Sequence, residues 1–175
     1  MTNTIYSATG CARCNITKKY MHENSIAYEE FDFKAEGKDA FSKFYRENRS
    51  EIFRDKDGVE FPVFTDGKVI RQGVSVVIGY LIAADTLQGF IGRSELHGEW
   101  LDGINISGGD QAYAEQLIQV LEYLKNSGLK IQAVTSGRNS EVLEAVMKKN
   151  LIDKVIMDVK GPAELYQGLT GTPID

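Results

Sequence analysis

The chain has 175 residues, a mass of 19.5 kDa and a formal net charge of −5, which suits one domain or two small ones with buried cores. Hydrophobic residues make up 42% and charged residues 26%, close to the average of soluble proteins, so the composition excludes intrinsic disorder. No apolar run approaches the roughly 20 residues that span a bilayer. An acidic chain with a pI near 5.2 also lacks the clustered cations that bind nucleic acid independently of sequence, so we expect neither a membrane nor a nucleic acid as partner.

Strand and helix patterns alternate over the first half of the chain. Short β-type runs bounded by turn residues are followed by apolar residues at helical spacing. The hairpin signal Asp66-Gly67 separates two further strands, so we expect these to pair antiparallel. The expected elements, in chain order, are a strand at 4–8, a helix carrying Ile16, Tyr20 and Met21, a strand at 27–33, a helix at about 38–48, a charged turn at 54–58, strands at 61–64 and 68–71, and a helix at 74–84.

The pattern fades between residues 85 and 102 and then restarts. Gly89, Gly92 and Gly98 lie among polar residues there, which is typical of a connection. Beyond it, alternating strands and helices with short turns predict right-handed βαβ units and parallel strands. The expected elements are strands at 103–106, 130–135 and 154–159, a helix carrying Ala114, Leu117, Ile118, Leu121 and Leu124, and a helix carrying Val142, Leu143, Val146 and Met147. The sequence thus predicts an α/β protein with a domain at 1–85, a linker at 86–102 and a small parallel βαβαβ domain at 103–175.

The two cysteines of the chain, Cys11 and Cys14, form a Cys-x-x-Cys motif. The first residues lack the basic and long apolar regions of a secretory signal, so we expect a cytoplasmic protein. In a reducing compartment, a pair at this spacing is more typical of redox chemistry or metal binding than of a structural disulfide. The motif is therefore the first candidate site.

Cys11 follows a predicted strand and begins a predicted helix. The unpaired N–H groups and the dipole of a helix N-terminus favour a thiolate over a thiol, and the thiolate is the nucleophile. Arg13, Lys18 and Lys19 would add positive potential if they lie near the sulfur. Cys14, in the first turn, is placed to attack a mixed disulfide on Cys11, which predicts a two-electron dithiol–disulfide cycle that requires no cofactor.

The stretch Tyr6-Ser7-Ala8-Thr9-Gly10-Cys11-Ala12-Arg13-Cys14 resembles the opening of a glutaredoxin or related thioredoxin-fold redoxin. The later stretch Phe61-Pro62-Val63-Phe64-Thr65-Asp66-Gly67-Lys68 resembles the part of that family in which a cis-proline packs beside the active-site disulfide. The resemblance implies a thioredoxin-like fold over 1–85 and a substrate-binding groove that includes Arg13, Phe61 and Pro62. It also implies a thiol-disulfide oxidoreductase in which Cys11 and Cys14 reduce a disulfide of a protein or a small molecule.

The electron donor stays open in this sequence. Glutathione-dependent members of the resembled family usually carry a Gly-Gly and acidic pair after the last strand, where this chain has Gln72-Gly73-Val74-Ser75. A thioredoxin-reductase-type donor and glutathione are therefore both candidates, with a disulfide-containing protein as the expected partner.

Two other interpretations of the cysteine pair also stay open. A zinc site would need His22 or His97 as further ligands, but tetrahedral sites want four ligands at compact spacing and His97 lies in the other half of the chain. The pair could also be inert, with the fold kept as a docking platform. We expect redox chemistry and no metal.

Four pieces of the second half resemble the radical S-adenosylmethionine activating enzymes that generate glycyl radicals. They are Ile104-Asn105-Ile106-Ser107-Gly108-Gly109-Asp110, Thr135-Ser136-Gly137, Met157-Asp158-Val159-Lys160 and Tyr166-Gln167-Gly168-Leu169-Thr170-Gly171. The resemblance implies that Gly108, Gly109 and Asp110 hold the amino group of the cofactor's methionine part. The alternative, which needs no ligand, is that Asp110 caps the N-terminus of the following helix.

The iron site of that second family is missing from this sequence. Its [4Fe–4S] cluster requires three cysteines in a C-x-x-x-C-x-x-C loop, and no cysteine follows Cys14. We therefore expect no cluster and no catalysis in the second domain, while binding of S-adenosylmethionine stays open. The alternative function for the whole chain is a scaffold whose second domain binds a nucleoside ligand or a glycyl-radical enzyme. The open edge of an incomplete parallel sheet also allows a homodimer.

Overall fold

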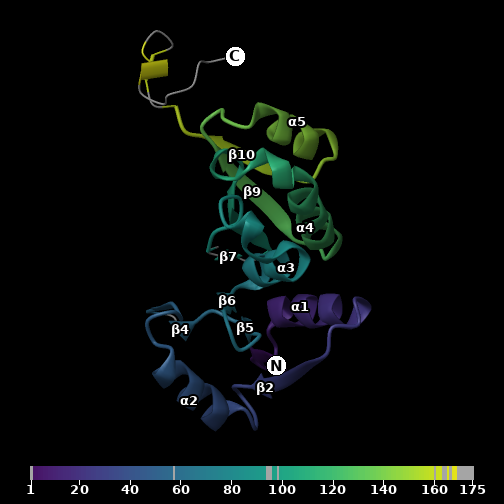
Figure 1. Cartoon of the computed structure of the whole chain (residues 1–175), viewed down its shortest axis with the longest axis vertical. Helices are drawn as coiled ribbons and strands as arrows, with labels where there is room; N and C mark the ends of the chain where they lie inside the picture. The colour runs from purple at the N-terminus through teal and green to yellow at the C-terminus, as the bar shows by residue number, and fades with distance from the viewer. Residues whose placement is uncertain are drawn as a thin grey trace. The chain divides into compact units, whose positions relative to one another are not determined.

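The computed structural model describes residues 2–56, 58–93, 96–97, 99–159, 161–162, 165 and 167–168. The chain divides into two compact units, Met1–Leu81 and Ile82–Asp175 (Figure 1). Each unit has its own buried core. Of the stretch 166–171, only Gln167 and Gly168 lie within the described residues, and Lys160 and the side chain of His97 lie outside them.

The first unit is built on a four-stranded mixed sheet in the order β2-β1-β5-β6. β1 and β2 run parallel and are joined by α1, whereas β5 pairs antiparallel with both β1 and β6. This is the strand order of the thioredoxin fold, so the expected glutaredoxin-like fold is confirmed. In chain order the elements are β1 (Asn3–Ser7), α1 (Ala12–Glu23), β2 (Tyr28–Asp32), α2 (Lys38–Glu47), β3 (Arg54–Asp55), β4 (Gly58–Val59), β5 (Val63–Thr65), β6 (Ile70–Gln72) and α3 (Val74–Ala83).

The side chains of the two central strands, β1 and β5, alternate between two buried clusters, one on each face of the sheet. Ile5 and Phe64 belong to one buried cluster, and their chain neighbours Tyr6 and Val63 belong to the other. Successive side chains of a strand point to opposite faces, so the two clusters lie on opposite sides of the sheet. The second cluster is aromatic, with the ring of Tyr6 stacked on Phe31 and Phe44 at centroid distances of 5.7 and 4.6 Å.

The charged turn expected at 54–58 contains a short hairpin in the structure. β3 and β4 pair antiparallel through Arg54 with Val59 and Asp55 with Gly58. The side chain of Asp55 accepts a hydrogen bond from Gly58 N at 3.0 Å, which closes the turn between the strands. The local chemistry of the turn was therefore recognisable, but strands of two residues carry no periodic signal.

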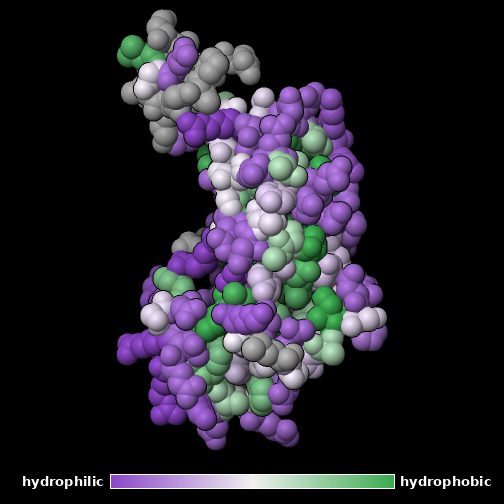
Figure 2. Space-filling view, viewed as in Figure 1, coloured by the Kyte–Doolittle hydropathy of each residue, from purple (hydrophilic) through white to green (hydrophobic). Residues whose placement is uncertain are grey.

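The second unit has a sheet in the order β10-β9-β8-β7. β8, β9 and β10 run parallel, as the alternating pattern predicts, and the short β7 is antiparallel at one edge. Helix α4 buries Leu117, Leu121 and Leu124 along one of its faces. The outer surface of the other helix, α5, is mostly hydrophilic, as Figure 2 shows. The elements are η1 (Ala84–Leu87), β7 (Leu96–His97), β8 (Trp100–Asn105), η2 (Ile106–Gly108), η3 (Gln111–Tyr113), α4 (Ala114–Asn126), β9 (Lys130–Thr135), α5 (Ser140–Lys148) and β10 (Lys154–Met157).

Several described residues of 86–102, a segment expected to be a linker, are instead buried in the second unit. Leu87, Phe90 and Ile91 are 3%, 0% and 6% exposed, and Ile91 forms a β-bridge with Ile104. β8 also begins at Trp100, three residues before the expected strand. The glycines hid this packing, because they interrupt the periodicity by which buried segments are recognised. Within the described residues, no helix has the length and apolar character needed to cross a bilayer.

Candidate active site

The Cys-x-x-Cys motif lies between the end of β1 and the first turn of α1, as predicted. Gly10 precedes it with a φ of +83°, a conformation that favours glycine and turns the chain toward the helix. Cys11 is the N-cap of α1 and forms a disulfide with Cys14, with 5.3 Å between their Cα atoms. Cys14 is 1% exposed whereas Cys11 is partly exposed, so Cys11 carries the sulfur that solvent and substrate can reach.

The N-terminus of α1 provides a hydrogen bond to the Cys11 sulfur. The backbone N–H of Cys14 donates to Cys11 Sγ at 3.1 Å, and the first turn of α1 contains no acidic residue. After reduction, the same N–H and the helix dipole stabilise a thiolate on Cys11. The geometry therefore suits nucleophilic attack by Cys11 and a resolving role for the buried Cys14.

The cis-proline loop lies beside the disulfide, as the resemblance to redoxins implies. The Phe61-Pro62 peptide bond is cis, and the carbonyl oxygen of Phe61 lies 3.9 Å from Cys11 Sγ. A disulfide sulfur carries no proton, so this contact becomes a hydrogen bond only when Cys11 is a thiol. The ring of Phe61 packs on Phe33 and Phe41 at 5.7 and 5.0 Å, so its backbone, not its ring, faces the sulfur.

The cations near the motif are paired with carboxylates, which differs from the expected positive potential. Arg13 Nη1 lies 3.1 Å from Glu60 Oε1, and Lys18 lies 2.8 Å from Glu30. Burial lowers the pKa of the Arg13 guanidinium from its ordinary value, and Glu60 opposes that shift. Lys19 lies 3.7 Å from Glu23 and is 66% exposed. The thiolate therefore depends on the helix N-terminus more than on these three cations.

The pair of Arg13 and Glu60 connects the two sides of the predicted groove, because Arg13 lies in the cysteine loop and Glu60 directly precedes the cis-proline loop. Their side chains are 26% and 16% exposed, and a pair of this kind contributes up to about 1 kcal/mol. Its main effect is thus to orient Arg13, not to stabilise the fold. Sequence analysis missed Glu60, which has no motif of its own.

Asp32 anchors the turn that precedes Cys11. Its carboxylate accepts hydrogen bonds from Thr9 Oγ1 at 2.6 Å, from Thr9 N at 3.0 Å and from Lys34 N at 2.8 Å. The hydrogen bond from the Thr9 side chain is the largest of the effects that lower the pKa of Asp32. The end of β2 therefore holds the cysteine loop in place, a role that sequence analysis did not identify.

Gln72 is the buried polar residue that orders the other side of the groove. Its amide donates to the carbonyl oxygens of Phe53 and Glu60 at 2.9 and 3.0 Å and accepts from Phe53 N at 2.9 Å. The next residue, Gly73, has a φ of +89°, and its N–H donates to Pro62 O at 2.9 Å. Sequence analysis used Gln72 and Gly73 only as a departure from the glutathione-binding pattern, whereas here they fix the cis-proline loop.

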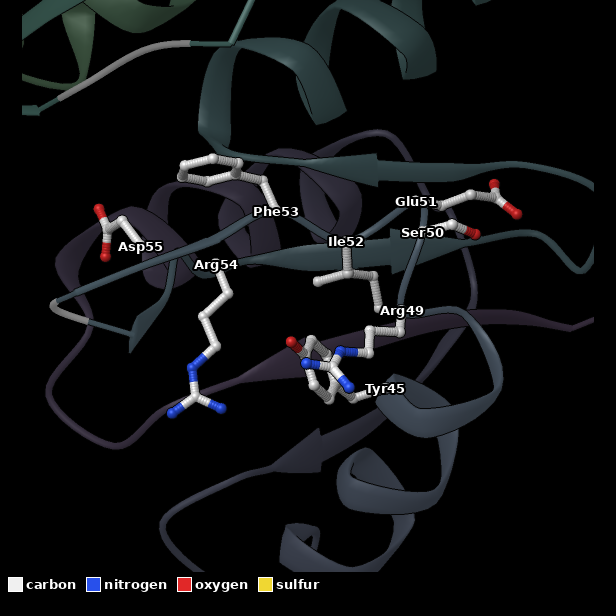
Figure 3. A pocket seen from close by; sticks show the side chains of 8 residues that line it. All are labelled: Tyr45, Arg49, Ser50, Glu51, Ile52, Phe53, Arg54 and Asp55. Carbon is white, nitrogen blue, oxygen red and sulfur yellow. The ribbon is translucent and has the colours of Figure 1, made fainter.

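A pocket of about 490 Å³ is lined by Tyr45 and residues 49–55, the segment that contains Phe53, to which Gln72 is hydrogen-bonded (Figure 3). In Figure 3, Arg49 and Arg54 extend to the same side of this segment, whereas Glu51 points away from them. Phe53, which is 38% exposed, is the apolar residue at its surface. The pocket contains neither cysteine, and its residues are Tyr45, Arg49, Ser50, Glu51, Ile52, Phe53, Arg54 and Asp55.

In the second unit, the glycine turn predicted to hold a cofactor is filled by protein atoms. A Cβ built on Gly108 would lie 2.6 Å from Gly89 O, and one on Gly109 would lie 2.1 Å from Cγ of Phe90. Asp110 Oδ1 accepts a hydrogen bond from Ala112 N at 2.9 Å and so caps the helical turn that follows. Packing within the chain therefore explains all three residues without a ligand.

The structure does bring two of the predicted motif pieces together. Ser107 Oγ lies 2.9 Å from Thr135 Oγ1 and accepts a hydrogen bond from Ser136 N at 2.8 Å. Asn139 Nδ2 donates to Ile106 O and Gly109 O at 2.9 and 2.8 Å. Both pieces thus meet beyond the carboxyl ends of the parallel strands β8 and β9, where α/β folds commonly bind ligands.

The residues present do not fit an iron–sulfur cluster. Both cysteines of the chain are joined in the disulfide of the first unit, so the second unit offers no thiolate ligand. Among the residues that the structure describes, there is also no group of three or more His, Cys, Asp or Glu side chains able to hold a metal ion.

Comparisons with known proteins found similarity to two different kinds of protein, an activating enzyme and a redoxin. No family model matches the chain. A protein of Methanocaldococcus jannaschii described as "Putative glycyl-radical enzyme activating enzyme" is 36% identical over 67 residues, which cover 38% of this chain and 28% of that protein. The chain thus spans little more than a quarter of this relative. The structure of the glutaredoxin-like protein NrdH-redoxin from Escherichia coli matches with 24% identity and a TM-score of 0.33, covering 42% of this chain and 84% of that one. The fold assignment itself rests on the strand order and on the position of the cis-proline.

Proposed function

We propose that the first unit is a thiol-disulfide oxidoreductase that reduces a disulfide in another protein through Cys11 and Cys14. The observation that carries this proposal is the arrangement of the two sulfurs. Cys11 is the partly exposed N-cap of α1, Cys14 is buried one turn later, and the Phe61 carbonyl lies 3.9 Å from Cys11 Sγ. The redox step needs no cofactor, and it requires a compartment that keeps the pair reduced, such as the cytoplasm.

The reaction begins with the reduced protein. The Cys11 thiolate attacks one sulfur of the substrate disulfide, which forms a mixed disulfide and releases the other substrate sulfur as a thiolate that takes a proton. Cys14 then loses its proton and attacks Cys11 Sγ. This step releases the second substrate thiol and forms the Cys11–Cys14 disulfide, so that two electrons pass from the pair to the substrate. An external dithiol or glutathione returns the two electrons.

The groove supplies positioning in this proposal. The backbone carbonyl of Phe61 lies beside the Cys11 sulfur, and Arg13, two residues after Cys11, is held by Glu60 at 3.1 Å. A substrate chain that binds there would meet backbone groups and one oriented guanidinium. Such contacts place a disulfide without demanding a particular substrate side chain.

A turnover assay with insulin as the disulfide substrate tests the proposal. Cys11→Ser should abolish turnover, because the attacking sulfur is gone. Cys14→Ser should stall at the mixed disulfide, which mass spectrometry detects as a covalent adduct. The matched control is Ala35→Ser, which introduces the same residue at an exposed position outside the motif and should leave turnover unchanged. Equal rates for wild type and Cys11→Ser would refute the proposal.

The surface next to the groove favours a protein over a small molecule as substrate. Phe53 is 38% exposed and hydrogen-bonded to Gln72, which also holds Glu60. A protein substrate can cover Phe53 while its disulfide lies at Cys11. Phe53→Ala should therefore raise KM for insulin and leave the rate with a small aromatic disulfide unchanged. An equal loss with both substrates would contradict a protein contact at Phe53.

The donor can be assigned by supplying the oxidised protein with two reducing systems in separate assays. One contains thioredoxin reductase and NADPH, and the other contains glutathione, glutathione reductase and NADPH. Gln72 stands in the stretch where glutathione-dependent redoxins carry their Gly-Gly and acidic pair, and here its side chain is bonded to the backbone of Phe53 and Glu60. This difference supports the dithiol-type donor. We propose that the first system supports the faster turnover.

The second candidate function is ligand or partner binding by the second unit. The meeting of Ser107 and Ser136 at the ends of β8 and β9, and the 67-residue similarity to an activating enzyme, favour it. The filled positions beside Gly108 and Gly109 speak against a ligand at the glycine turn itself. Calorimetry with S-adenosylmethionine tests this candidate, since binding lost in Asp110→Ala would show a ligand role beyond the helix cap.

A further inference from the structure

The outer edge of β10 carries the most exposed apolar strand among the described residues. Parallel strands are ordinarily covered on both faces, and the neighbouring β9 accordingly buries Ile131, Ala133 and Thr135. All four residues of β10 are exposed, and Val155, Ile156 and Met157 are 37%, 39% and 57% exposed. β10 pairs with β9 on one side, and no described strand pairs with it on the other. An apolar strand with an open edge is a template for pairing.

The residues that flank this apolar stretch carry charges of opposite sign. The sequence reads Lys154-Val155-Ile156-Met157-Asp158, basic at one end and acidic at the other. A twofold axis through Ile156 would bring a second copy of β10 alongside in the antiparallel sense. Lys154 would then lie opposite Asp158 of the second copy, Val155 opposite Met157, and Ile156 opposite itself.

The neighbouring registers lack this complementarity. The twofold pairing centred on Val155 places Lys154 opposite Ile156 and Asp153 opposite Met157, so each charge faces an apolar residue. The pairing centred on Met157 places Asp158 opposite Ile156. A one-residue slip would place opposed side chains on opposite faces of the sheet, which a twofold antiparallel pair does not allow. The charges therefore select the register that is centred on Ile156.

The backbone is also oriented for this pairing. Asp158 N donates to Thr135 O of β9 at 2.8 Å, in step with the register of the two strands, so the N–H of Asp158 points toward β9. Successive residues of a strand direct their N–H and C=O groups to alternate sides, so those of Ile156 point toward β9 and those of Val155 and Met157 point to the open edge. At the twofold axis the two Ile156 residues form a non-hydrogen-bonded pair, and Val155 of each copy can exchange both hydrogen bonds with Met157 of the other.

We propose that β10 forms a homodimer interface in which two copies pair antiparallel about Ile156, with Lys154 of each copy opposite Asp158 of the other. The two sheets then become one continuous sheet across the axis. The occupant is a second copy of this chain because the edge is complementary to itself in charge and in apolar length. The proposal is independent of the redox function.

The test is sedimentation of the full chain under reducing conditions, so that a Cys11 cross-link cannot imitate the dimer. Wild type should reach twice its 19.5 kDa mass at concentrations of about 100 μM, a range typical of a modest interface. Lys154→Asp and Asp158→Lys should each weaken the dimer about tenfold or more, because each creates two like-charge pairs. The double variant should restore the wild-type dissociation constant. Lys43→Asp, the same charge reversal on the exposed side of α2, should change nothing.

Three results would overturn the proposal. They are a wild type that remains monomeric at that concentration, a dimer insensitive to both single reversals, and a double variant that folds but does not recover the dimer. Folding is followed by the fluorescence of Trp100, the single tryptophan of the chain. Amide hydrogen exchange of wild type gives a second readout that needs no variant. The N–H groups of Val155 and Met157 should become more protected as the concentration rises, and unchanged protection of both in a dimer would place the interface elsewhere.

Discussion

Gln72 should be the most costly single polar residue to remove from the first unit. It is 9% exposed and makes three hydrogen bonds to backbone groups of Phe53 and Glu60. Each bond contributes about 1 kcal/mol net, and its loss leaves a backbone group without this partner. Gln72→Leu keeps a similar volume and removes all three, so the free energy of unfolding should fall by about 3 kcal/mol. For a unit of this size that corresponds to a Tm lower by roughly 12–24 °C.

Chemical denaturation followed by far-UV circular dichroism measures this loss. Trp100 lies in the second unit, so its fluorescence reports that unit separately and should keep its wild-type midpoint. Gln88→Leu, the same substitution at an exposed position, should shift the stability by less than about 0.5 kcal/mol. If Gln72→Leu unfolds at the wild-type midpoint, then the amide does not hold the segment that leads to the cis-proline, and the reasoning fails.

Three further substitutions test other parts of the structure. Thr17→Val should raise the free energy of unfolding by about 1 kcal/mol in denaturant titration, because the buried Thr17 hydroxyl has no hydrogen-bond partner among the described residues; a loss of stability would contradict this. Asp32 has a lowered pKa in the folded state, so its stabilising effect is present above the unfolded value of about 3.9 and is lost as the pH falls through the folded pKa. The denaturation midpoint of Asp32→Asn should therefore fall less between pH 5 and pH 2 than that of wild type, and parallel curves would refute the role of Asp32. Gly109→Ala should destabilise the second unit by about 1–3 kcal/mol or more, seen in Trp100 fluorescence, because its Cβ would overlap the Phe90 ring; an unchanged midpoint would show that the turn can open.

The order of the larger elements could be predicted because their residues repeat with the period of a helix or a strand. The hairpin signal Asp66-Gly67 and the cysteine loop were placed correctly for the same local reason. α3 forms despite its three valines and a glycine, because burial of Val74, Val77 and Ile78 outweighs their weak helix propensity. Tertiary packing decides such cases, and a sequence window does not contain it.

The supporting residues of the site could not be found in the same way. Asp32, Glu60 and Gln72 lie 18, 46 and 58 positions from Cys14, and each acts through a contact that only the folded sheet creates. The expected potential from Lys18 failed for a related reason, since its partner Glu30 comes from the adjacent strand β2. Long-range pairing of charges is not encoded in local spacing.

The central claim is that Cys11 is the accessible, ionised sulfur and Cys14 the sheltered one. The most direct measurement is the alkylation rate of each cysteine in the fully reduced native protein at neutral pH, resolved by peptide mass mapping. We predict that Cys11 reacts faster than a free cysteine in solution and that Cys14 is modified only after unfolding. Equal labelling of both residues, or a Cys11 rate no greater than that of free cysteine, would contradict the account.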